Sequence, residues 1–226
     1  MVFSCRILAL ALFTTSAIAV PLCTKRTYNG ITPAQLIQIA PEMAACNATA
    51  PFPEECRDAK QSAPFVNQGF EDYAITSKGE KAAILSLMLF ESGNFKFDIN
   101  HFPGRPGQGT RNLMTFPFVH QYAVDTPSTS AQALALAPNA SDPSISNDTM
   151  NAVRALVLED RLSFASGMWF YKASGPEKIG CTGNSTLVEG LKAETEQGWA
   201  DYITNCIFTT VTDERKAVWQ KTLAAI

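Results

Sequence analysis

The chain has 226 residues, and its 18 Lys and Arg against 21 Asp and Glu give a net charge of −3. This acidic balance argues against a nucleic-acid partner, because affinity for nucleic acid rests on neutralising phosphates. The length is sufficient for one sizeable domain with a full core, and we expect a monomer.

Residues 1–19 have the pattern of a secretory signal peptide. Arg6 provides a positive start, residues 7–13 are apolar but too few to span a bilayer, and residues 17–19 form an A-x-A cleavage site. We therefore expect a secreted, extracellular protein whose residues 20–226 form a single domain. Loss of Arg6 leaves a net charge of about −4. Later apolar runs are too short for a membrane helix, so we expect no membrane partner.

Acceptor sequences for N-linked glycans support a secretory route. The N-x-[S/T] pattern occurs at Asn47, Asn139, Asn147 and Asn184. One such sequence in a chain of this length is close to chance, whereas four behind a signal peptide indicate a glycosylated eukaryotic protein.

Five cysteines remain once the signal peptide is removed, and pairs should form in an oxidising compartment. We expect Cys46 to pair with Cys56 and Cys181 with Cys206, because each pair closes a local loop. Cys23 is then left over. Connectivity cannot be deduced from sequence, and an odd cysteine can pair between chains or stay free.

Helical periodicity runs through most of the chain, so we predict a mainly α (α+β) fold without repeats or linkers. Thr32-Pro33 caps the first helix, and Ser77-x-x-Glu80 is a capping box for the third. The predicted helices cover residues 34–40, 64–74, 78–92, 116–123, 130–137, 148–159, 161–174, 185–206 and 213–225.

Residues 94–115 are the exception to this helical trend. They place Phe95, Phe97, Ile99 and Phe102 among Pro and Gly. This composition predicts a small β-hairpin or a structured loop.

Glu91 is the candidate catalytic residue. Ile84, Leu87, Met88 and Glu91 share one stripe of the third predicted helix, and Gly93 marks its end. Apolar surroundings and the negative end of the helix dipole should both raise the pKa of Glu91, as a general acid requires. A structural role is the alternative, with Glu91 bonded to backbone amides or paired with an arginine such as Arg105 or Arg111.

Other chemistries lack the residues that they need. The chain has no G-x-S-x-G nucleophile motif, and its two histidines, His101 and His120, do not form H-E-x-x-H. Oxidised cysteines make a zinc site unfavourable. We expect neither a metal nor another cofactor.

Three motifs together resemble the chitinase-type and endolysin-type glycoside hydrolases of the lysozyme superfamily. They are F-E-S-G-N-F at residues 90–95, G-Q-G-T-R-N-L at 107–113 and the helical segment S-F-A-S-G-M-W-F-Y-K-A-S at 163–174. The resemblance spans roughly residues 62–175. It implies a lysozyme-like helical domain with a small β-hairpin beside a cleft.

The resemblance also implies roles for individual residues. Glu91 would be the general acid, and Asp98 would be the second carboxylate unless it faces solvent. The residues implied to contact or support the substrate are Gln108, Thr110, Arg111, Asn112, Tyr122 and Trp169. The sequence departs from the family at Phe90, where histidine is usual, at Asn112, where glutamine is usual, and in lacking a second glutamate.

These features predict a secreted glycoside hydrolase that cleaves a β-1,4-linked amino-sugar polymer. Chitin or chitosan is favoured over peptidoglycan, because a negative chain suits a neutral or cationic polymer. If no second carboxylate acts, a lytic or substrate-assisted route remains open. The alternative is a catalytically inactive carbohydrate-binding or effector-like secreted protein on the same fold.

Overall fold

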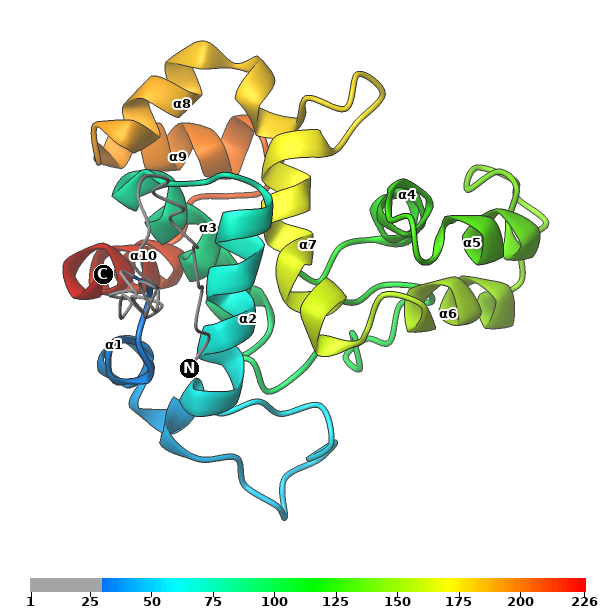
Figure 1. Ribbon diagram of the computed structural model, residues 1–226, viewed down its shortest axis with the longest axis horizontal. Coiled ribbons are helices and arrows are strands. Elements are labelled where there is room, and N and C mark those ends of the chain that lie inside the picture. The colour runs from blue at the N-terminus through cyan, green and yellow to red at the C-terminus, as the bar shows by residue number, and fades with distance from the viewer. Residues whose placement is uncertain (1–29) are drawn as a thin grey trace, which may run out of the picture. The chain divides into compact units, whose positions relative to one another are not determined.

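The computed structural model describes residues 30–226, so the predicted signal peptide and Cys23 lie outside the described residues. Ile31–Ile226 forms one compact unit. Between residues 30 and 226 the chain forms ten α-helices and two 3-10 helices (Figure 1), so the mainly helical fold is confirmed. They are α1 (Pro33–Ile39), η1 (Pro41–Ala44), α2 (Ala59–Asp72), α3 (Lys78–Glu91), α4 (Phe116–Asp125), α5 (Ser130–Leu136), α6 (Asn147–Ala155), α7 (Asp160–Ala173), η2 (Gly180–Gly183), α8 (Ser185–Lys192), α9 (Glu196–Asn205) and α10 (Asp213–Ala225).

Helix α3 forms the centre of the hydrophobic core. It packs against α7, α8 and α10, and α2 packs along α7. Residues 82–89 of α3 are all buried, so this helix is covered on every side and does not present a single inward stripe. A helix that is apolar all round is typical of the core of a larger domain.

Helices α4, α5 and α6 pack on one another and form a second group, drawn in green in Figure 1. Helix α4 also contacts α7, and thereby joins this group to the core. Tyr122 of α4 and Trp169 of α7 pack with ring centroids 5.0 Å apart. Both side chains are almost fully buried, so they are core residues.

The predicted long helix at residues 185–206 is wrong, because two helices occupy this segment. Glu194 has a φ of 57°, which ends α8, and the Thr195 side chain accepts a hydrogen bond from the Gly198 amide to start α9. The backbones of α8 and α9 meet at two glycines. A Cβ added to Gly198 would lie 2.2 Å from the carbonyl carbon of Gly190, so this close approach requires glycine.

The small β-hairpin is also not found, because the described residues contain isolated bridges without a strand. Ile99 bridges Gly109, and Gly109 bridges Met114. Asn94, Phe95 and Thr110 have φ values of 60°, 61° and 70°. These left-handed residues interrupt the extended backbone that a hairpin needs. Residues 94–115 therefore form the structured loop that was the other expectation.

Capping signals read from the sequence are largely correct. The Thr32 side chain accepts a hydrogen bond from the Gln35 backbone amide. The Gln35 side-chain oxygen accepts one from the Thr32 backbone amide, which completes a capping box. Ser77 caps α3 by accepting from the Glu80 amide. The Glu80 side chain does not close that box, because it accepts a hydrogen bond from the Tyr171 hydroxyl at 2.8 Å.

Both expected disulfides are present in the structure. Cys46 pairs with Cys56 and Cys181 with Cys206, with Cα atoms 5.9 and 5.3 Å apart. Disulfides are typical of proteins that fold in oxidising compartments. Within residues 30–226, none of the helices combines the length and the apolar character needed to cross a bilayer.

Candidate functional site

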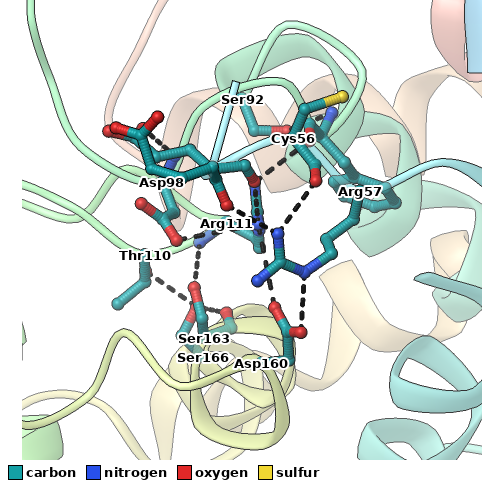
Figure 2. Close-up of polar contacts among 12 residues, drawn as sticks. Cys56, Arg57, Ser92, Asp98, Thr110, Arg111, Asp160, Ser163 and Ser166 are labelled. Carbon is teal, nitrogen blue, oxygen red and sulfur yellow. Dashed lines mark hydrogen bonds and ion pairs between the residues drawn. The ribbon is translucent and has the colours of Figure 1, made fainter. Parts of the chain in front are cut away.

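A buried arginine organises the loop between α3 and α4. Arg111 is 0% exposed, and its guanidinium donates hydrogen bonds to the backbone carbonyls of Phe95 and Glu55. It also lies 3.6 Å from the carboxylate of Asp98 and 3.8 Å from that of Asp160. Figure 2 shows these groups converging from separate segments. Because a guanidinium cannot lose its charge, burial is tolerable only with such partners.

Further contacts tie this cluster to the start of α7. The Arg111 backbone amide donates to the Ser163 carbonyl at 3.3 Å, and the Ser166 hydroxyl donates to Thr110 Oγ1 at 2.9 Å. Arg57, which follows the Cys46–Cys56 loop, pairs with Asp160 at 2.7 Å. The cluster therefore fastens three segments that are distant in sequence.

Asp98 is the titrating member of this cluster. Burial raises its pKa from 3.8 to about 6, against the opposing effect of the Arg111 guanidinium, and the neighbouring Glu55 carboxylate adds to the increase. The Asp98 backbone amide donates to Glu55 Oε2 at 3.0 Å, and Glu55 Oε1 lies 2.6 Å from His101 Nε2. Asp98 is 6% exposed, so its side chain points away from solvent.

Asp98 should make the folded state less stable as the pH rises from about 4 to about 6. The folded protein holds the Asp98 proton to a higher pH than the unfolded chain, so it binds more protons in this window. The loss amounts to at most about 3 kcal/mol. Urea denaturation of wild type and Asp98→Asn at pH 4, 5, 6 and 7 measures this effect. A stability difference between the two proteins that stays constant with pH would contradict it.

Glu91 is held by an arginine from the last helix. Its Oε1 accepts from Arg215 Nη2 at 3.0 Å, and both side chains are partly buried. The Arg215 guanidinium also lies over the Phe90 ring, 4.4 Å from its centroid. Glu91 and Asp98 are thus held by different arginines. The structural alternative correctly anticipated an arginine partner for Glu91, but the partner is Arg215 and neither Arg105 nor Arg111.

Five of the six residues expected to contact substrate have side chains bonded to internal partners, and the exception is Asn112. The Gln108 amide donates to the Leu113 carbonyl at 2.9 Å, and the Tyr122 hydroxyl donates to the Leu162 carbonyl at 2.8 Å. Trp169 donates to Asp125 at 3.2 Å. Thr110 and Arg111 are fully buried, so their side chains cannot contact a polymer at the surface. Asn112 is partly buried, with its side-chain oxygen enclosed.

A cavity of about 300 Å³ lies elsewhere, where α4, α7, α8 and α9 meet. All of its lining residues are uncharged: Phe118, Phe170, Ser174, Gly175, Pro176, Gly180, Cys181, Asn184, Leu187, Asn205, Cys206 and Phe208. The rings of Phe118 and Phe170 pack edge to face, with centroids 4.9 Å apart. This volume is at the lower end of the range for small-molecule sites.

Sequence reasoning missed this cavity as a site. Three of its lining residues were singled out in the sequence for other reasons: Cys181 and Cys206 as a disulfide pair, and Asn184 as a glycan acceptor. All four acceptor asparagines are exposed. Within residues 30–226 no group of three or more His, Cys, Asp or Glu side chains is arranged to hold a metal ion.

The comparisons with known proteins revise the function. No protein-family model matches the chain, and no solved structure matches it. A bifunctional dioxygenase (DOX)-epoxy alcohol synthase (EAS) of Fusarium oxysporum is 33% identical over 154 residues, which cover 67% of this chain. The chain spans only 11% of that protein's length.

This relative overturns the glycosidase interpretation. Its name describes a dioxygenase and an epoxy alcohol synthase, and nothing found supports a glycoside hydrolase. The resemblance to lysozyme-superfamily enzymes, the polysaccharide substrate and the general-acid role of Glu91 are therefore wrong. The alternative of an inactive carbohydrate-binding or effector-like protein has no support either. The contacts of Glu91, Arg111 and Asp98 agree with this correction, because each is used within the fold.

Proposed function

We propose that Ile31–Ile226 is a small-molecule-binding unit that serves oxygenase chemistry. Its ligand is the uncharged, oxygenated part of an amphipathic molecule such as an epoxy alcohol. The cavity between α4, α7, α8 and α9 carries this proposal, because it combines apolar walls with a few polar groups.

The walls of the cavity suit an alkyl chain. Phe118, Phe170 and Leu187 come from three different helices and line it together with the Cys181–Cys206 disulfide. Burial of apolar area supplies the affinity, at about 25 cal/mol per Å² before the costs of association. A volume of about 300 Å³ limits the occupant to one short chain segment.

The polar groups of the lining suit a neutral oxygen function. Asn205 carries an amide, which donates and accepts hydrogen bonds, and the Ser174 hydroxyl already donates to the Phe170 carbonyl at 2.7 Å. A hydroxyl or an epoxide oxygen can bond to such groups. Among residues 30–226, no cationic side chain lines the cavity to pair with a carboxylate.

The relative's name supports the choice of ligand class. It describes a dioxygenase joined to an epoxy alcohol synthase, and an epoxy alcohol is an uncharged oxygenated molecule. We further propose that the protein enters the secretory route. The two disulfides and the exposed glycan acceptors support that location.

Calorimetric titration of the protein with 2,3-epoxyoctan-1-ol tests the binding proposal. We expect a Kd below about 1 mM. Octanoate should bind at least about tenfold more weakly, because its charge has no partner in the cavity. If wild type binds neither compound, the binding proposal is wrong.

Two neighbouring substitutions in α9 show whether the cavity is the site. Asn205→Phe places a ring in the lining and should weaken binding of 2,3-epoxyoctan-1-ol at least about tenfold. Thr204→Phe adds the same ring at an exposed position of the same helix that does not line the cavity, and should leave binding unchanged. Equal effects of both substitutions would place the ligand elsewhere.

A further inference from the structure

Asn184 combines two features at the open side of the cavity. It is the acceptor of the sequence Asn184-Ser185-Thr186, and it is the N-cap of α8. Its Oδ1 accepts the Leu187 amide at 3.1 Å. An N-linked sugar bonds to Nδ2, so glycosylation would leave this cap intact. The exposed side chain has room for a sugar.

Phe208 exposes an aromatic ring at the same cavity. Its side chain is 79% exposed, although a large apolar ring is favoured in the interior. The neighbouring backbone is anchored on both sides. The Ile207 amide donates to the Tyr202 carbonyl at 3.0 Å, and the Thr209 amide donates to the Ile203 carbonyl at 3.1 Å. The ring is therefore held at the surface by structured backbone.

We propose that Asn184 carries an N-linked glycan whose first N-acetylglucosamine packs against the ring of Phe208. Both residues line one cavity of about 300 Å³, so the sugar attached to one lies within reach of the other. The C–H face of a pyranose is apolar and electropositive, which suits the negative face of an aromatic ring. The glycan covers the ring that the polypeptide leaves exposed.

Attachment follows ordinary glycosyl-transfer chemistry. The Asn184 Nδ2 forms a bond to C1 of an oligosaccharide that is activated as a lipid pyrophosphate. The bond from C1 to the pyrophosphate oxygen breaks, the lipid pyrophosphate leaves, and Nδ2 loses one proton to solvent. No oxidant or reductant is involved.

A double-mutant cycle tests this packing in protein secreted from a eukaryotic host and trimmed to one N-acetylglucosamine per site. Thr186→Ala removes the acceptor sequence but keeps the Asn184 cap, and Phe208→Ser removes the ring. Mass spectrometry gives the occupancy of Asn184, and urea denaturation gives the unfolding equilibrium constant. We expect an occupied Asn184 and a roughly fivefold larger unfolding constant for Thr186→Ala.

The cycle has a matched control at a second acceptor. Thr149→Ala removes the acceptor sequence at Asn147, which does not line the cavity. Its effect on the unfolding constant should be the same with and without Phe208→Ser. In a Phe208→Ser background, Thr186→Ala should change the unfolding constant by less than twofold. An unoccupied Asn184, or an equal effect of Thr186→Ala with and without Phe208, overturns the proposal. No ligand is present, so this result is independent of the binding function.

Discussion

Replacing Arg111 by methionine should lower the free energy of unfolding by about 3–5 kcal/mol. The guanidinium is fully buried and bonds to the carbonyls of Phe95 and Glu55, and it lies near the carboxylates of Asp98 and Asp160. Methionine fills a similar volume but leaves these acceptors without their donor. Urea denaturation at pH 7 measures the loss.

Arg105→Met is the control for this substitution. Arg105 lies in the same loop but is exposed, so its replacement should change stability by less than about 0.5 kcal/mol. Adding Asp98→Asn to Arg111→Met should recover part of the loss, because it removes a buried charge that has lost its partner. A loss below about 1 kcal/mol for Arg111→Met would show that the cluster does not organise this loop.

Removing the disulfide between Cys181 and Cys206 should also lower the free energy of unfolding by a large amount. The two cysteines are separated by 25 residues, and the chain-entropy relation assigns about 3.5 kcal/mol to a loop of this size. Both cysteines also line the cavity, so the double alanine variant should lose binding of 2,3-epoxyoctan-1-ol as well as stability. Thermal denaturation and calorimetric titration measure the two effects.

The other disulfide provides a matched comparison. Cys46 and Cys56 are 10 residues apart, so the same relation assigns about 2.8 kcal/mol to their bond. Neither cysteine lines the cavity, and the double alanine variant should bind the compound with unchanged affinity. Loss of binding in this variant too would mean that binding depends on general stability and not on the lining.

Features set by near neighbours in the sequence could be predicted. The caps predicted at Thr32 and Ser77 depend on near neighbours, and both are present. The capping box predicted at Ser77 is not completed, and a box that was not predicted forms at Thr32. The disulfide between Cys46 and Cys56 closes a short loop. Helical periodicity identified most helices for the same reason, since it reflects contacts one turn apart.

Features set by distant segments could not be predicted. Glu91 pairs with Arg215, 124 positions away, and no local pattern identifies that partner. Arg111 was expected to contact or support a substrate, yet its side chain is fully buried among partners from distant segments. The cavity could not be predicted either, because its lining comes from four helices that are separate in the sequence. A local motif at the end of α3 suggested an enzyme class, but similar local motifs can occur in unrelated sites.

An NMR titration of the ¹⁵N-labelled protein with 2,3-epoxyoctan-1-ol tests the binding function most directly. The amide shifts should concentrate on cavity residues from separate elements, with Phe118, Cys181, Leu187 and Phe208 among the largest. They should saturate with one common Kd. The binding function is contradicted if no amide shifts at saturating compound, or if the shifts centre on the Arg111 cluster and leave the cavity residues unchanged.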